Sequence, residues 1–371
     1  MEEQEPASEL KKTPFYKYNV EAGAKMVPFA GYIMPIQYTG ITEEHLTVRK
    51  NVGMFDLSHM GELFIAGPGA LEYIQKMTTN DASLLEIGQI QYSSMCYDNG
   101  GMVDDLLVYH LEDQYMMIVN AANIEKDYEW LKSHLCDGVE LYNRSDEYGL
   151  LAIQGPNAQK VLEKMSDYDF ESLPYYHSAV VEIGGHSVLL SRTGYTGEDG
   201  FEIYIPGDLA HDLWRISFDA GRKYDMKLIG LGARDSLRLE MKMSLYGNDI
   251  DQTTTPIEAG LAWIVKLDKG DFIARDVLAR QKEEKPSRRL VCLEIDGRAF
   301  PRTGYELISN GDVVGKITSG TFSPSLNKPI AMGYLPRHLT RIGNRVEVMI
   351  RGKTFPATVV KPPFYKEGSH R

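Results

Sequence analysis

A charged, proline-broken segment in the last third of the sequence separates two parts with different patterns. This segment, QKEEKPSRR, spans residues 281–289 and lies between two apolar stretches. Beyond it, short alternating apolar and polar stretches recur with turn residues between them: LVCLEI, DVVGKIT, AMGYL, RVEVMI and ATVV. This pattern predicts a small β-barrel or sandwich of about 80 residues. We therefore expect a separate C-terminal domain.

The longer part before this segment predicts an α+β fold. Strands are expected at residues 61–66, 91–96, 105–109 and 115–119, and helices at residues 43–50, 70–77, 125–135, 209–223 and 233–243. No parallel βαβ unit repeats along the chain. Because 371 residues exceed what one ordinary core contains, two or three domains are expected in total.

Composition excludes several classes of function. The net charge is -12 and no block of lysines or arginines occurs, so we expect no nucleic-acid partner. Cys96, Cys136 and Cys292 lie far apart without a CxxC or Cys/His pattern, which predicts no metal site and a reducing compartment. The N-terminal stretch MEEQEPASELKK is acidic, and no apolar run reaches membrane-spanning length. These features predict a cytoplasmic protein without a membrane partner.

The familiar motifs of hydrolases and nucleotide-binding enzymes are missing or incomplete. The sequence contains no P-loop, HExxH or GxSxG motif. Two stretches, GPGALE at 67–72 and GLGARD at 230–235, half-match a dinucleotide-binding loop but lack its third glycine. Neither stretch predicts a Rossmann domain.

Two adjacent carboxylates enter an apolar segment at GGMVDDLLVY, residues 100–109. Side chains alternate along a strand, so Asp104 shares a face with Leu106, and Asp105 shares the other with Leu107 and Tyr109. One interpretation is that one Asp caps the Gly-Gly turn while the other is solvated. The other is that Asp105, at the first residue of the strand, binds a flat ligand bearing N–H groups. A hairpin at 99–101 would bring Tyr92 and Tyr97 beside it.

A second group of candidates lies in SRTGYTGEDGFEIYIP, residues 191–206, and in the helix after Gly230. Three glycines predict a tight loop with a solvated tip at Glu198 and Asp199. Glu202 then begins a strand. Arg234 lies in the first turn of a helix, where the helix dipole disfavours a guanidinium, so something other than helix stability is expected to hold it.

Many long motifs in one order make the chain resemble the T-protein family of the glycine cleavage system, the folate-dependent aminomethyltransferases. The resemblance covers nearly the whole chain, from MVPFAGYIMPIQY to PFYK. Its motifs are GMFDLSHMGE (53–62), TTND (78–81), GGMVDDLLVY (100–109), VNAANIEKD (119–127), LAIQGP (151–156), RTGYTGEDGFEI (192–203), GLGARDSLRLEMKMSLYGNDI (230–250) and TSGTFSPSL (318–326).

The resemblance implies a three-domain cloverleaf around a central folate hole. Domain 1 would comprise residues 1–59 and 143–280, domain 2 residues 60–142, and the C-terminal β-barrel residues 281–371. It also implies a reaction: the methylene of an aminomethyl group, carried on the lipoyl arm of H-protein, is transferred to tetrahydrofolate with release of ammonia. Lipoate would belong to the partner H-protein, and no metal is implied.

The resemblance also assigns roles to individual residues. Asp105 would be the catalytic carboxylate, with Asp104 as its structural partner. The expected role of Asp105 is to position the folate and to stabilise charge, in preference to acting as a general base. Glu202 would accept the amino group and ring N–H of the pterin, and Arg234 would contact the folate or its neighbouring carboxylate. The other residues that would contact folate are Tyr92, Met60, Leu107, Tyr109, Asn120, Tyr195, Trp263 and Tyr365.

Three competing functions are less consistent with the sequence. Related folate-binding proteins of iron–sulfur assembly or tRNA modification carry a KGCYxGQE-like motif where this chain has TGYTGEDGFE, without the cysteine. Dimethylglycine- or sarcosine-oxidising enzymes add an FAD domain for which this chain has no room. A paralogue that binds folate without catalysis is disfavoured by the presence of Asp105.

Overall fold

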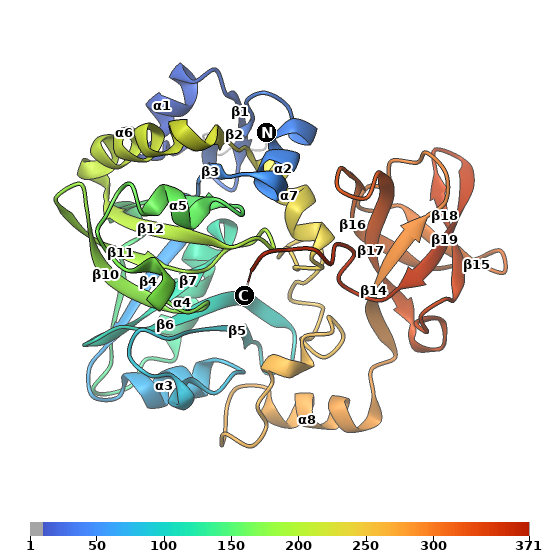
Figure 1. Ribbon diagram of the computed structural model, residues 1–371. Helices are drawn as coiled ribbons and strands as arrows, with labels where there is room; N and C mark the ends of the chain where they lie inside the picture. The colour runs from blue at the N-terminus through green and yellow to red at the C-terminus, as the bar shows by residue number, and fades with distance from the viewer. Residues whose placement is uncertain (1–9, 371) are drawn as a thin grey trace, which may run out of the picture.

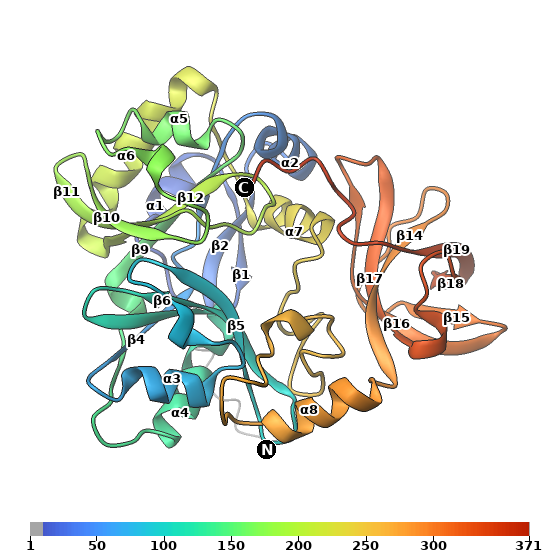
Figure 2. The same ribbon diagram turned by 60° about the horizontal axis from the view of Figure 1, so that its bottom comes forward.

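The computed structural model describes residues 10–370, so most of the acidic N-terminal stretch lies outside the described residues. Figure 1 shows two β-sheets on one side of the molecule and a small barrel on the other, and Figure 2 gives a second view. Helix α8 (Arg275–Glu284) leads the chain from the sheets to the barrel. After the barrel, the last residues return toward the sheets (Figure 1).

The first sheet has six strands, in the order β10-β11-β12-β9-β3-β13, and is assembled from distant parts of the chain. Its strands are antiparallel except for β13, which pairs in parallel with β3. Their bounds are β3 Gly53–Asp56, β9 Tyr148–Gln154, β10 Ser178–Ile183, β11 His186–Ser191, β12 Gly200–Pro206 and β13 Lys227–Leu228. The associated helices are α1 Tyr16–Glu21, α2 Ile41–Lys50, α5 Ala158–Leu162, α6 Ala210–Gly221 and α7 Leu231–Glu240, and a hairpin is formed by β1 Lys25–Phe29 and β2 Tyr32–Gln37.

The second sheet has five antiparallel strands and occupies one continuous stretch between β3 and β9. Its order is β5-β6-β7-β4-β8. The bounds are β4 Gly61–Ala66, β5 Ile90–Cys96, β6 Met102–His110, β7 Gln114–Val119 and β8 Glu140–Asn143, with helices α3 Ala70–Met77 and α4 Ile124–Ser133. Helix α3 buries residues at the i, i+3, i+4, i+7 spacing of an amphipathic helix: Ala70, Tyr73, Ile74 and Met77.

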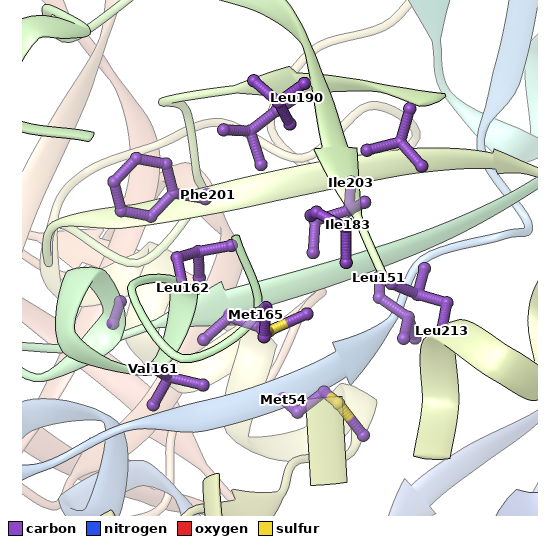
Figure 3. Close-up of a cluster of buried hydrophobic side chains, with 14 of the residues drawn as sticks. Met54, Leu151, Val161, Leu162, Met165, Ile183, Leu190, Phe201, Ile203 and Leu213 are labelled. Atoms are coloured by element: carbon purple, nitrogen blue, oxygen red, sulfur yellow. The ribbon is translucent and has the colours of Figure 1, made fainter. Parts of the chain in front are cut away.

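The alternation of side chains along the strands builds four layers. One face of the six-stranded sheet, including Leu151 and Ile203, packs on Val161 of α5 and Leu213 of α6 (Figure 3). Its other face meets the five-stranded sheet, whose far face packs on α3 and α4. Because side chains alternate, Tyr204 of β12 and Tyr109 of β6 enter the layer between the sheets, where their hydroxyls lie 3.0 Å apart. Glu202 and Asp105 have the same parity as these tyrosines and therefore face this layer too.

The C-terminal barrel is closed by six antiparallel strands in the order β14-β17-β16-β15-β18-β19. Their bounds are β14 Arg288–Ile295, β15 Glu306–Ser309, β16 Asp312–Ser323, β17 Lys328–Pro336, β18 Arg345–Ile350 and β19 Lys353–Val360. Closure leaves no free strand edge. The predicted α+β class and C-terminal barrel are thus confirmed.

A group of buried charges joins the barrel to the rest of the molecule, and we call it the junction cluster: Arg49, Glu198, Arg238, Glu240 and Asp249. Arg49 Nη2 lies 2.9 Å from Glu240 Oε2, and Nη1 lies 2.8 Å from Glu198 Oε1. On the barrel side, Ser325 donates to Glu240, and Arg238 donates to the hydroxyl of Ser319. Arg238 Nη1 lies 2.6 Å from Asp249 Oδ2, so each charge of the junction cluster has a partner of opposite sign.

The sequence located most elements correctly and misplaced some of their ends. The sequence predicted Asp105 at the first residue of its strand. Strand β6 instead begins at Met102, so Asp105 lies inside the strand. Helix α7 ends at Glu240, before the predicted end at Met243, and Lys242 after it has φ 61°. Strand β15 was not predicted; it has only four residues, and its pairing with β16 contains a register shift.

Candidate active site

A cavity of about 440 Å³ opens where the layer between the two sheets meets the segment that follows α7. Its wall is formed by residues from the β1–β2 turn, the β3–β4 loop, strands β5, β6, β7, β9 and β12, the start of α7, and residues 120–122, 176, 193–195, 241–246, 260, 261 and 263. None of the barrel strands contributes to this wall. The volume is in the range of sites that bind small organic ligands.

Asp105 is held in the cavity wall by two donors. The β5–β6 pairing places Tyr92 opposite Leu107. Leu107 is two residues after Asp105 in β6 and therefore lies on the same face of the strand. The Tyr92 hydroxyl donates to Asp105 Oδ2 at 2.7 Å, and Asn120 Nδ2 donates to Oδ1 at 2.9 Å. Burial, followed by the nearby Asp104, raises the pKa of Asp105 to about 7 despite these two bonds. A carboxyl of this kind can change protonation state near neutral pH.

Asp104 points away from the cavity, toward helix α4, and is fully buried. Its carboxylate accepts the backbone N–H of Asn120 at 3.0 Å and the side-chain amides of Asn120 and Asn123 at 2.9 and 2.6 Å. The Gly-Gly turn is capped by Asn99, whose Oδ1 accepts the N–H of Gly101 at 2.9 Å. The interpretation that an Asp caps this turn is therefore wrong.

Glu202 and Arg234 line another part of the wall. Thr193 donates to Glu202 at 2.6 Å. Burial raises the pKa of Glu202, while the Thr193 bond and the charge of Arg234 oppose that rise. The Arg234 guanidinium lies 4.7 Å from the ring centre of Tyr195. Among the described residues it forms no ion pair, unlike Arg238, whose guanidinium is held by Asp235 and Asp249. Arg234 therefore presents unpaired donors to the cavity.

Aromatic and apolar side chains complete the wall. The rings of Tyr92 and Trp263 stack with centres 5.9 Å apart. Trp263 is 59% exposed although it lines the cavity, which places it at the opening. Met60, Leu107, Asn120 and Tyr195 also line the cavity. The structure thus brings together nine of the residues proposed from the sequence.

Two of the proposed folate contacts do not reach the cavity. Tyr109 is buried deeper between the sheets, where its hydroxyl donates to Ser191 at 3.1 Å and contacts Tyr204. Tyr365 lies in the C-terminal tail, and its ring packs 4.2 Å from the Arg49 guanidinium of the junction cluster. Both are bound by internal partners and are not among the residues of the cavity wall.

Other expectations also require correction. Tyr97 packs edge-on against Trp130 and not beside Asp105. The predicted solvated tip at Glu198 and Asp199 is wrong, because both carboxylates are paired with arginines. Glu198 binds Arg49 and Asp199 binds Arg192 at 2.7 Å.

Among the cavity residues that were not identified from the sequence are His59, Tyr176 and Lys242. His59 is 3% exposed, and its Nδ1 has no hydrogen-bond partner within residues 10–370. Burial and the charge of Arg234 lower its pKa to about 3, so the imidazole is neutral. His59 directly precedes Met60 in the motif SHMGE, and this position next to a proposed folate contact could have identified it as a candidate. Tyr176 has φ 62°, and nothing in the local sequence indicated its position in the wall.

No metal centre accompanies the cavity in the part of the chain that the structure describes. No group of three His, Cys, Asp or Glu side chains there could hold a metal ion. The same residues contain no helix that could span a membrane.

Comparison with known proteins identifies the family. A family model described as the GCVT N-terminal domain matches residues 15–269, and one described as the glycine cleavage T-protein C-terminal barrel domain matches residues 288–366. The chain belongs to the glycine cleavage T-protein family. Aminomethyltransferases from Halothermothrix orenii and Bacteroides thetaiotaomicron are 48% and 49% identical to it, over 96% of this chain and 100% of each of those proteins.

A solved T-protein structure is similar throughout. The crystal structure of glycine cleavage system aminomethyltransferase T from Bartonella henselae matches with a TM-score of 0.92 and 35% identity, covering 98% of this chain and 100% of that one. The chain is therefore an enzyme of the transferase class, an aminomethyltransferase of the glycine cleavage system.

Proposed function

We propose that this T-protein transfers the methylene of an aminomethyl-lipoyl group, carried by an H-protein, to tetrahydrofolate, producing methylene-tetrahydrofolate, ammonia and dihydrolipoyl H-protein. The observation that carries this proposal is the Asp105 carboxyl, held at the cavity wall by Tyr92 and Asn120 with a pKa of about 7. The cavity also provides a flat aromatic wall and two further charged groups, as a pterin would require.

The pterin ring would be recognised by Glu202. A carboxylate can accept an amino group and a neighbouring ring N–H at the same time. Arg234 supports this role because its charge favours the ionised form of Glu202. Its guanidinium, free of ion pairs within the described residues, would contact the folate. Tyr92, Trp263, Met60, Leu107, Asn120 and Tyr195 would form the surrounding contacts.

Asp105 would act where positive charge develops. When the C–N bond of the aminomethyl group breaks, ammonia leaves and the methylene carbon on sulfur becomes electron-poor. N5 of tetrahydrofolate attacks this carbon and loses its proton, and the C–S bond breaks to leave the lipoyl sulfur. N10 then attacks the methylene carbon to close the bridge and loses its own proton. The two protons released from N5 and N10 balance those taken up by ammonia and by the lipoyl thiol. An ionised Asp105 stabilises the developing cation and orients N5. Its near-neutral pKa also suits it to accept the N5 proton.

The remaining assignments complete the proposal. Residues 1–59 and 143–280 would form domain 1, residues 60–142 domain 2, and residues 281–371 the barrel domain. The layers support this division, because the five-stranded sheet is continuous in sequence between β3 and β9. The enzyme would work in the cytoplasm without a metal, and its Cys96, Cys136 and Cys292 are free thiols.

A reconstituted assay tests this function. Purified enzyme is mixed with H-protein carrying the aminomethyl-lipoyl group, and ammonia and methylene-tetrahydrofolate are measured with and without tetrahydrofolate. We expect ammonia release to require folate. Release that is equal without folate, or no release at all, would contradict the proposal.

Binding tests the pterin contact separately. Glu202→Gln should weaken tetrahydrofolate binding about 10- to 100-fold, the cost of losing hydrogen bonds to a charged group. The matched control is Glu182→Gln, at an exposed position of β10. Equal affinities of the two variants would refute the role of Glu202.

A further inference from the structure

A buried carboxyl without any hydrogen-bond donor lies behind the proposed catalytic residue. Asp127, in helix α4, has an exposed fraction of 0%, and neither of its oxygens has a partner within residues 10–370. Lys126 Nζ is 3.8 Å from Asp127 Oδ1 and donates to the carbonyl of Val103. An ionised carboxylate in such a place would be very unfavourable, because nothing replaces its hydration.

The neighbour of Asp127 is the carboxylate of Asp104. The two side chains lie within hydrogen-bonding reach of each other. Two carboxyls in contact cannot both be ionised without a large cost, so they share one proton. Asp104 accepts three N–H bonds from Asn120 and Asn123, which favours its ionised form. Asp127 receives none, so the proton belongs on Asp127.

This contact continues to the cavity through Asn120. The Asn120 side-chain nitrogen donates both to Asp104 Oδ1 at 2.9 Å and to Asp105 Oδ1 at 2.9 Å. Asp104 also binds the Asn120 backbone N–H. The orientation of Asp104 therefore fixes the amide that holds Asp105.

We propose that Asp127 is a positioning residue: its protonated carboxyl donates to Asp104, which locks Asn120 and thereby Asp105. This inference rests on the proposed function for its effect on turnover, while its proton assignment stands apart from it. The charged and titratable groups that face Asp127 lie on several elements: Asp104 and Asp105 of β6, Lys126 of α4, Tyr97 of the β5–β6 turn and Tyr246 after α7.

The decisive variant is Asp127→Asn, which has almost the same shape and keeps an N–H donor for Asp104. Because a neutral group replaces a neutral group, the acid limb of the pH profile of kcat/KM should stay in place and kcat should remain within about threefold. A shift of that limb to lower pH would show that a negative charge had been removed, and would overturn the inference.

Infrared difference spectroscopy gives a readout that needs no turnover. Measured well above pH 7, where Asp105 is ionised, Asp127→Asn should remove a C=O stretching band of a protonated carboxyl, whereas the control Asp113→Asn, at an exposed position of the β6–β7 turn, should not. An unchanged band in Asp127→Asn would refute the proton assignment. Loss of the band from an enzyme that proved inactive with folate would sustain the assignment while the proposed function failed.

Asp127→Leu tests the positioning role, because leucine fills the space without a donor. We expect kcat to fall about tenfold relative to Asp127→Asn, with a smaller change in KM for folate, because Asp105 loses its fixed orientation. Equal kcat values for the two variants would mean that the contact does not position Asp105. If Asp127→Leu does not fold, the infrared and pH results on Asp127→Asn still decide the proton assignment.

Discussion

The cavity wall and the junction cluster both bury carboxyl groups, but the pKa values of these groups shift in opposite directions. Burial raises the pKa of Asp105 to about 7, and no arginine is paired with it among the described residues. Glu240 of the junction cluster is also buried, yet its pKa falls to about 2, because bonds and charges from His45, Arg49 and Ser323 outweigh burial. The difference shows that the neighbours of a buried carboxyl can reverse the effect of burial on its pKa.

This difference also separates stability from chemistry. A carboxylate fixed as an anion among arginines holds two parts of the molecule together but cannot exchange a proton near neutral pH. A carboxyl with neutral donors costs stability when ionised and can respond to a reaction.

The largest effect is expected at the junction cluster. Glu240→Gln removes the charge that faces Arg49 and leaves a buried guanidinium less well compensated, so the free energy of unfolding should fall by about 3–5 kcal/mol. Urea denaturation measures it, with Glu294→Gln at the barrel surface, where Glu294 pairs with Lys328, as the control. A change as small as in the control would show that the cluster does not stabilise the interface.

At the cavity wall, the same type of substitution should act on rate and not on stability. Asp105→Asn should lower kcat about 10²- to 10³-fold, because the charge that stabilises the developing cation is lost. Its melting temperature should be unchanged or higher, because no buried carboxyl remains to be ionised. A variant that loses stability together with activity would contradict this contrast.

The pH dependence of the two regions should have opposite signs. For Asp105, whose pKa is raised in the folded state, the stabilising contribution is present below its unfolded pKa and is lost as pH rises through about 7. For Glu240 the contribution is present above the unfolded pKa and is lost as pH falls toward about 2. Melting curves across pH, on the wild type and on each substituted chain, check both slopes.

Activity should follow the ionisation of Asp105, so kcat/KM should rise with pH through an acid limb near 7. Tyr92→Phe should move this limb to higher pH, because the Tyr92 bond lowers the pKa of Asp105. A limb that stays in place in Tyr92→Phe would mean that another group titrates.

The smallest effect is expected for Tyr109→Phe. Its hydroxyl bonds to Ser191 and Tyr204 between the sheets, so removing it should cost about 0.5–1.5 kcal/mol of stability. Tetrahydrofolate affinity, measured by calorimetry, should stay near that of the wild type. A large loss of affinity would place Tyr109 back among the ligand contacts.

Local patterns in the sequence predicted what depends on local geometry. Strand alternation correctly predicted that Asp104 and Asp105 lie on opposite faces of their strand. The predicted hairpin at residues 99–101 correctly placed Tyr92 beside Asp105. Contacts between distant segments could not be predicted in this way. Glu198 looked solvated because its partner, Arg49, lies 149 positions away in the chain. Tyr365 was carried over from a motif, whereas its ring packs on that same arginine.

In the sequence, the whole five-stranded sheet is inserted between strands β3 and β9 of the six-stranded sheet. This order has a consequence for synthesis on the ribosome. The five-stranded sheet needs only residues 61–143, so it can pair as soon as that stretch emerges. Strand β3, made earlier, must wait for β9 and then for β13, whose last residue is Leu228. Nascent chains should therefore gain protease resistance first in the five-stranded sheet, while the six-stranded sheet remains open to proteolysis until its final strand has been translated.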